Sequence, residues 1–195
     1  MTALEQALTK GEFAVTAEVA PPKGTDVSEM MENAEFLRGK VHAINVTDQQ
    51  SSVMRLGSLA SCHLLKEAGF EPVFQLTTRD RNRIALQSDL LSAYALGIEN
   101  VLCLTGDYVT LGDHPQAKPV FDLDSVSLLM AAKGLENGTD MAGESLEGAP
   151  SFYLGAVVTP GYEPLELQLL KMERKIKAGA QFFQTQAVYD PEVFR

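Results

Sequence analysis

The chain has 195 residues, 45% of them hydrophobic, and a formal net charge of −10 at pH 7. A chain of this length buries one sizeable core, so we expect a single domain over residues 1–195. The acidic balance argues against non-specific binding to nucleic acid or to anionic membrane surfaces, which requires a basic footprint. No apolar run approaches the ~20 residues of a membrane span, and residues 1–13 lack the order of a signal peptide. The cytoplasm is therefore the simplest location.

The cysteines and histidines give no sign of a metal site. Cys62 falls in a helical pattern and Cys103 in a buried-strand pattern. Two lone thiols fit a reducing compartment, and we expect both as small buried hydrophobic residues. The three histidines, His42, His63 and His114, show no metal-ligand spacing.

Short apolar runs alternate with longer amphipathic stretches along the whole chain. The runs predict strands over residues 13–20, 41–47, 71–77, 100–104, 152–158 and 181–187. The stretches between them predict helices over residues 26–38, 53–68, 82–96, 124–135 and 164–178. Alternation of strand and helix predicts a parallel sheet.

Two architectures place helices between parallel strands: a doubly wound open sheet and a (β/α)₈ barrel. The first is marked by Gly-x-Gly-x-x-Gly after its first strand, whereas residues 21–24 here read Pro-Pro-Lys-Gly. Polar residues follow successive strands instead, at 47–50, 77–80 and 106–107. Because successive barrel strands deliver such residues to one rim, we predict a (β/α)₈ TIM barrel.

The predicted barrel is incomplete, with about six of its eight strands. An open sheet of six strands exposes two edges and part of its core, and unpaired edges promote association. Either the chain is a fragment or a partner supplies the rest. We therefore expect the 195-residue chain, made alone, to aggregate or to need a partner.

Segments at these strand ends resemble methylenetetrahydrofolate reductases over nearly the whole length. They read AEVAPPKG at 17–24, INVTDQQ at 44–50, LTTRDRNR at 76–83, NVLCLTGDY at 100–108, KPVFDLDS at 118–125, ERKIKAGAQFFQTQ at 173–186 and VYD at 188–190. Each piece alone is generic, and their order at matching strand ends carries the resemblance. The RDRNR stretch and the long loop over 113–125 are most similar to the branch found in anaerobes, including acetogens.

The resemblance implies a (β/α)₈ barrel with bound FAD, or FMN, that reduces 5,10-methylenetetrahydrofolate to 5-methyltetrahydrofolate. This reaction belongs to one-carbon metabolism and methionine biosynthesis. NAD(P)H or a reduced partner protein would supply the electrons. The branch implies a zinc-containing or iron–sulfur partner subunit, and the enzyme would be a homo- or hetero-oligomer.

Glu18, near the end of the first strand, matches the family's catalytic acid. The substrate's five-membered ring must open to an iminium before hydride can reach its carbon, and opening requires a proton on the departing nitrogen. From the strand context alone, a solvated strand-edge glutamate is an equal alternative.

Two further positions are implied to bind folate. Asp107 matches an aspartate beside the flavin that contacts the pterin, and a carboxylate there would accept two hydrogen bonds. A capping or turn role is its alternative. Gln186 matches the glutamine that recognises folate, because a carboxamide offers a donor and an acceptor. Gln184 is its nearby competitor.

The remaining cofactor-binding residues come from the same strand ends and one helix. Thr47 and Asp48 match positions that hydrogen-bond the flavin, and Gln75 stands where other members have a flavin-contacting histidine. Lys175 matches a lysine near the cofactor's phosphates, with a solvated helix face as its alternative. The turn of Thr105 and Gly106 completes the set, because glycine lets the backbone approach the isoalloxazine closely.

Three arginines, Arg79, Arg81 and Arg83, form the densest basic cluster of the sequence. They could bind the flavin diphosphate, a nicotinamide cofactor or a partner protein. Equally, they could bond nearby acidic residues around the start of the helix that follows.

Two functions of other classes stay open at this point. The first is a non-catalytic folate-binding or scaffold subunit of a methyl-transfer complex, and a colourless protein would favour it. The second is a corrinoid-linked methyl carrier built on a folate barrel, which would need no flavin.

Overall fold

The computed structural model describes residues 1–189 and 192, so the motif residue Asp190 lies outside the described part. Its sheet consists of six parallel strands in the order β1-β2-β3-β4-β5-β6. Spatial order follows chain order, whereas a doubly wound sheet reverses its order at a switch point. The strands are β1 (Thr16–Val19), β2 (Ala43–Val46), β3 (Pro72–Thr77), β4 (Asn100–Leu104), β5 (Tyr153–Val158) and β6 (Phe182–Thr185).

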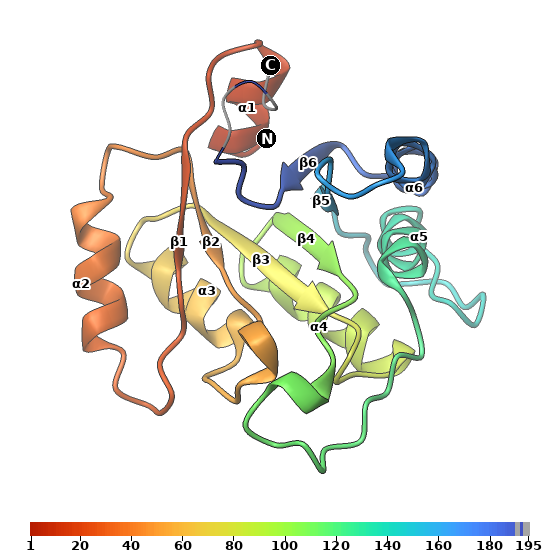
Figure 1. Ribbon diagram of the computed structural model, residues 1–195, viewed down its shortest axis with the longest axis horizontal. Coiled ribbons are helices and arrows are strands. Elements are labelled where there is room, and N and C mark those ends of the chain that lie inside the picture. Colours follow the sequence, from red (N-terminus) through yellow and green to blue (C-terminus); the bar gives the residue numbers. More distant parts are fainter. Residues whose placement is uncertain (190–191, 193–195) are drawn as a thin grey trace.

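The helices between the strands pack on one face of this sheet, as Figure 1 shows. They are α2 (Ser28–Phe36), α3 (Ser58–Glu67), α4 (Arg83–Ala95), α5 (Ser125–Glu136) and α6 (Leu165–Lys177). The sheet is curved strongly enough for Gln184 of β6 to bond Asn45 of β2 across its other face. Helices outside and a curved sheet inside form a (β/α)₈ barrel with six of its eight strands, which confirms the predicted fold class.

Side-chain alternation divides the core into an outer and an inner part, because successive strand residues point to opposite faces. Outward residues such as Ile44, Phe74 and Leu76 pack against the helices and are almost fully buried. Inward residues at the amino ends of the strands form a second apolar cluster, which includes Ala43 and Val73.

Helix α1 (Ala3–Thr9), which our prediction omitted, covers the amino-terminal end of the barrel. The Thr2 side chain accepts from the backbone of Glu5, whose side chain accepts in return, so a capping box starts the helix. Leu4 then packs among the inward apolar residues, and Thr2 Oγ1 donates to Asn100 Oδ1 at 2.6 Å. The carboxyl ends of the strands lie at the opposite end of the sheet.

Two predicted boundaries were wrong by several residues. The helix expected from residue 53 begins at Ser58, because a short 3₁₀ turn (Gln50–Ser52) and an extended segment precede it. The strand expected from residue 13 begins at Thr16, and Phe13 is 88% exposed. Cys62 and Cys103 are buried, as predicted, and burial raises the pKa of the Cys103 thiol to about 12.

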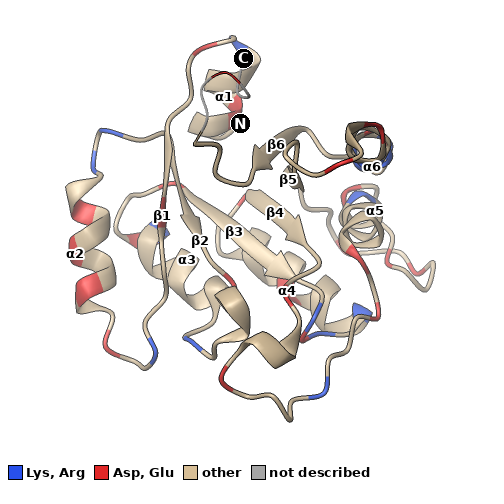
Figure 2. Ribbon diagram, in the orientation of Figure 1, with Lys and Arg blue, Asp and Glu red and all other residues tan. Residues whose placement is uncertain are grey.

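Basic and acidic residues are interspersed in the loops at the carboxyl ends of the strands (Figure 2). In the described part of the chain, no helix is long and apolar enough to cross a membrane. The same residues contain no group of three His, Cys, Asp or Glu side chains that could hold a metal ion.

Candidate functional site

The inner face of the sheet becomes polar toward the carboxyl ends of the strands. There the inward positions above the apolar cluster carry Glu18, Thr47, Gln75, Thr77 and Gln184, and these side chains line a cavity of about 550 Å³. Ligand pockets commonly have volumes of about 300–1,000 Å³. All nine predicted site residues line this one cavity: Glu18, Thr47, Asp48, Gln75, Thr105, Gly106, Asp107, Lys175 and Gln186.

Glu18 lies on the inward face of β1, and its exposed side chain lines the cavity. Partial burial raises the pKa of its carboxyl above the ordinary value, because a less hydrated site disfavours the charged form. Among the described residues, no hydrogen-bond donor contacts this carboxylate. The group is therefore available to hold a proton toward the cavity.

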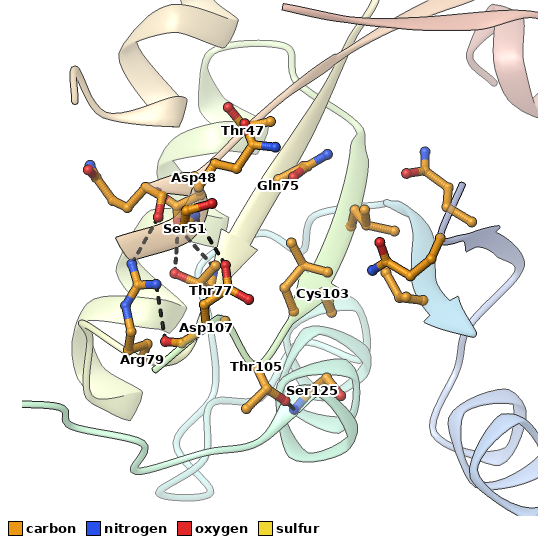
Figure 3. Close-up of a pocket in the computed structure, with 18 of the residues that line it drawn as sticks. Thr47, Asp48, Ser51, Gln75, Thr77, Arg79, Cys103, Thr105, Asp107 and Ser125 are labelled. Carbon is orange, nitrogen blue, oxygen red and sulfur yellow. Dashed lines mark hydrogen bonds between the residues drawn. The ribbon is translucent and has the colours of Figure 1, made fainter. Parts of the chain in front are cut away.

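Thr47 also lines this cavity. Its Oγ1 is buried and has no hydrogen-bond partner among the described residues. A buried hydroxyl without a partner is costly, so a ligand that bonds it would gain affinity. Gln75, on the next strand, is also buried on the inward face (Figure 3).

Asp48 differs from its neighbours because its carboxylate is already bonded within the protein. Its Oδ2 accepts from the backbone N and Oγ1 of Thr77, both at 2.9 Å. Arg81 donates to both carboxylate oxygens, at 2.7 and 3.1 Å, and the Asp48 side chain is 0% exposed. Asp48 thus ties the ends of β2 and β3 together, and this leaves its backbone for contact with a cofactor.

Arg79 is buried, and all its hydrogen-bond partners are groups of the protein itself, which the sequence did not indicate. Its guanidinium is 2% exposed and has all five donors occupied. Nε and Nη2 donate to the carboxylate of Asp80, and Nη1 donates to Ser52 Oγ at 2.8 Å and to the Asp107 carbonyl at 3.3 Å. Nη2 also donates to the Gln49 carbonyl. Arg79 therefore joins the loops that follow β2, β3 and β4 (Figure 3).

The loop after β2 adopts an unusual backbone. Gln49, Ser51 and Ser52 have φ values of 49°, 55° and 59°, a left-handed region that is unfavourable for side chains other than glycine. Strained backbone persists only where the surroundings hold it. The bonds from Arg79 to both ends of this turn supply that restraint.

The Arg79-held turn positions Asp107. Asp107 Oδ2 accepts from the backbone N of Ser51 at 3.1 Å, and its side chain lies at the exposed rim of the cavity. The preceding Gly106 has φ +93°, and an added Cβ would lie 3.2 Å from the Cβ atoms of Thr77 and Arg79. Glycine is therefore favoured here by the backbone conformation, and the space for a side chain is tight.

Lys175 points into the barrel rather than along a solvated helix face. Its Nζ donates to the Val157 carbonyl at 2.5 Å, near the end of β5. Burial lowers the pKa of its ammonium, Lys171 lowers it further, and Asp124 opposes both effects. Gln186, beyond the end of β6, is exposed at the cavity's rim.

The three arginines of the cluster form ion pairs with acidic residues of the same chain. Arg79 pairs with Asp80, Arg81 with Asp48 and Asp89, and Arg83 with Asp122. The alternative in which these arginines bond nearby acids is therefore confirmed for all three.

Comparison with known proteins identifies the family of the chain. The sequence profile of the methylenetetrahydrofolate reductase family matches residues 3–195. The chain belongs to the methylenetetrahydrofolate reductase family. A search of curated protein sequences finds no match to it.

Solved structures share the fold of this reductase-family chain. An uncharacterized Clostridium thermocellum protein that binds two copies of 5-methyl-5,6,7,8-tetrahydrofolic acid superposes with a TM-score of 0.65 at 17% identity. The match covers 98% of this chain and 60% of the Clostridium thermocellum protein. A 2,3-dimethylmalate lyase of the PEP mutase/isocitrate lyase superfamily has a TM-score of 0.63 at 12% identity, covering 100% of this chain and 65% of its own. The chain thus spans less than two thirds of either structure. At these identities the similarity establishes the fold alone.

The residues of this reductase-family site suit a flavin. The buried Thr47 hydroxyl lacks a partner, and Gly106 leaves the rim of the cavity free of a side chain. The Lys175 ammonium would face a phosphate, and backbone at Asp48 and Gly106 would face polar ring atoms. The function of the site is proposed below.

Proposed function

We propose that this protein, within its complete barrel, is a flavin-dependent methylenetetrahydrofolate reductase. It would bind FAD and convert 5,10-methylenetetrahydrofolate to 5-methyltetrahydrofolate in one-carbon metabolism and methionine biosynthesis. The supporting observation is the convergence of Glu18, Thr47, Asp107 and Gln186, from four different strand ends, on one cavity. NAD(P)H or a reduced zinc/iron–sulfur partner subunit would supply the electrons.

Each residue has a role that its surroundings support. The flavin, when bound, supplies the hydride. Glu18 holds a proton, favoured by its raised pKa, for the nitrogen that leaves the substrate's five-membered ring. Asp107 and Gln186 orient the pterin at the rim. Thr47, with Gln75, Thr105 and the backbone beside them, holds the flavin.

A non-catalytic folate-binding subunit is the second candidate. It is favoured by the Clostridium thermocellum neighbour, which binds 5-methyl-5,6,7,8-tetrahydrofolic acid and shares the fold over 98% of this chain. Such a subunit needs the folate contacts but neither the proton of Glu18 nor the flavin contacts of Thr47.

The two candidates are separated by purifying the complete protein and measuring flavin absorbance and reductase activity. For the reductase we expect a yellow protein with one flavin per chain that forms 5-methyltetrahydrofolate when a reductant is supplied. A colourless protein that binds 5-methyltetrahydrofolate but turns nothing over would establish the folate-binding subunit instead.

Asp107→Asn is expected to weaken folate binding and to raise the flavin reduction potential. A negative charge beside a group that gains charge on reduction opposes that reduction, so its removal favours the reduced flavin. A redox titration measures the potential. Asp140→Asn makes the same charge change at a residue that bonds only backbone in the loop after α5, and it should leave the potential unchanged. An unchanged or lower potential in Asp107→Asn would count against its place beside the flavin.

A further inference from the structure

A hydrogen-bonded pair of carboxamides crosses the barrel interior below the cavity. Asn45 is 6% exposed on the inward face of β2 and is the register partner of Glu18 on β1. Its Nδ2 donates to the Ala17 carbonyl and to Thr16 Oγ1, each at 3.3 Å. Its Oδ1 accepts from Gln184 Nε2 of β6 at 2.7 Å. The Asn45 side chain therefore connects β1, which carries the proposed acid Glu18, to β6, after which the proposed folate-binding residue Gln186 follows.

The orientation of both amides follows from one backbone carbonyl. The Ala17 carbonyl can only accept, so Asn45 must turn its NH₂ group toward β1 and its oxygen toward β6. The oxygen of Asn45 in turn requires an N–H from Gln184, so Gln184 turns its own NH₂ group toward Asn45. The Oε1 atom of Gln184 is thereby left over, and no donor among the described residues contacts it.

Gln184 lines the cavity, whereas Asn45 lies beneath it. Gln186, which follows the end of β6, lines the same cavity as Gln184. The side chains of the two glutamines differ in how tightly they are held. Gln184 is half-buried and its Nε2 is hydrogen-bonded, whereas Gln186 is exposed and has no partner among the described residues. Gln184 is thus a preoriented acceptor, and such acceptors bind with less loss of side-chain entropy.

We propose that Gln184 is a further substrate-specificity residue, which accepts a ring N–H of a reduced pterin through Oε1, and that Asn45 is the positioning residue that fixes its orientation. The inference deepens the proposed folate function and rests on it. Asp107 is assigned to the amino and N–H groups of the pyrimidine ring, which oxidised and reduced pterins both carry. The N–H that reduction adds to the second ring matches an additional acceptor deeper in the cavity, and Gln184 Oε1 is that acceptor.

The test measures binding of 5-methyltetrahydrofolate and of oxidised folic acid to the complete, flavin-loaded protein by titration calorimetry. Gln184→Leu should weaken binding of the reduced ligand by about two- to tenfold, as expected for one lost hydrogen bond, and leave folic acid binding unchanged. Asn45→Leu should also weaken binding of the reduced ligand. The double variant should match Gln184→Leu alone, because Asn45 acts only through Gln184.

Flavin content and the melting temperature of every variant separate ligand recognition from folding. Gln87→Leu, which makes the same change at a partly exposed position of α4 outside the cavity, should bind both ligands like the unmodified protein. Equal binding of the reduced ligand by Gln184→Leu, or additive effects in the double variant, would overturn the inference and leave the reductase proposal intact. An unmodified protein that binds no reduced folate would overturn both.

Discussion

Glu18→Gln is expected to lower the rate of 5,10-methylenetetrahydrofolate reduction by about 10²- to 10⁴-fold, the usual contribution of general acid catalysis. The amide keeps the size of the side chain but has no proton to give to the departing nitrogen. Flavin content and reduction of the flavin by its electron donor should stay unchanged, because neither requires that proton. Stopped-flow measurement of the two half-reactions separates these effects.

The pH dependence of the rate offers an independent check. Partial burial raises the pKa of the Glu18 carboxyl, and the protonated acid is the active form. The rate of folate reduction should therefore fall as pH rises through that raised pKa, and Glu18→Gln should lose this dependence. For stability, a carboxyl with a higher pKa in the folded protein favours folding below its unfolded pKa, and this contribution is lost as pH rises through the folded pKa. Glu18→Gln should consequently melt at the same or a higher temperature at neutral pH.

Glu12→Gln is the matched control for this substitution. Glu12 is exposed in the segment before β1 and lies outside the cavity, so its replacement should change neither the rate nor the pH profile. Near-normal folate turnover by Glu18→Gln would show that another group donates the proton.

The fold was predictable because its signals are local. Alternation in the strands fixes which side chains face inward, and the polar residues after each strand mark one rim. Even the omitted helix α1 has a local signal, since Thr2 and Glu5 form the Thr-x-x-Glu capping box that starts it. The late start of α3 was harder to predict, because residues 53–57 are held outside the helix by contacts with distant parts of the chain, such as the bond from Leu56 N to the Pro22 carbonyl.

The missed parts of the site depend on contacts between distant residues. Asn45 and Gln184 are 139 residues apart, and nothing within either strand indicates that the sheet brings them together. Arg79 stands two residues from Arg81 in one basic run, yet it alone is almost fully buried, because the loops after β2 and β4 converge on it. Asp48 was expected at the flavin, but its carboxylate is bonded to Arg81, 33 residues away. The family resemblance placed Asp48 at the site but did not indicate what its side chain contacts.

Arg79→Met is expected to lower the free energy of unfolding by about 3 kcal/mol or more and to abolish stoichiometric flavin binding. Removal of one partner of a fully buried ion pair costs about 3–5 kcal/mol. The Asp80 side chain is 37% exposed, which lowers that cost, but the carbonyls of Gln49 and Asp107 also lose donors. Without those bonds the left-handed turn at Ser51 and Ser52 has nothing to offset its strain, so it should relax and withdraw the backbone N–H that holds Asp107. Urea unfolding followed by circular dichroism gives the stability, and flavin absorbance gives the occupancy.

Two arginine variants make this prediction specific to the buried guanidinium. Arg83→Met removes a cation from the same segment, but its pair with Asp122 is exposed, and exposed ion pairs contribute little to stability. It should therefore unfold near the urea concentration of the unmodified protein and keep its flavin. Arg79→Lys retains the charge but replaces five planar donors by three, so it should restore part of the stability and less of the flavin binding. Equal stability of the Arg79→Met and Arg83→Met proteins would mean that the turn after β2 holds its conformation without Arg79, and Asp107 would then owe its position to the bond from Ser51 alone.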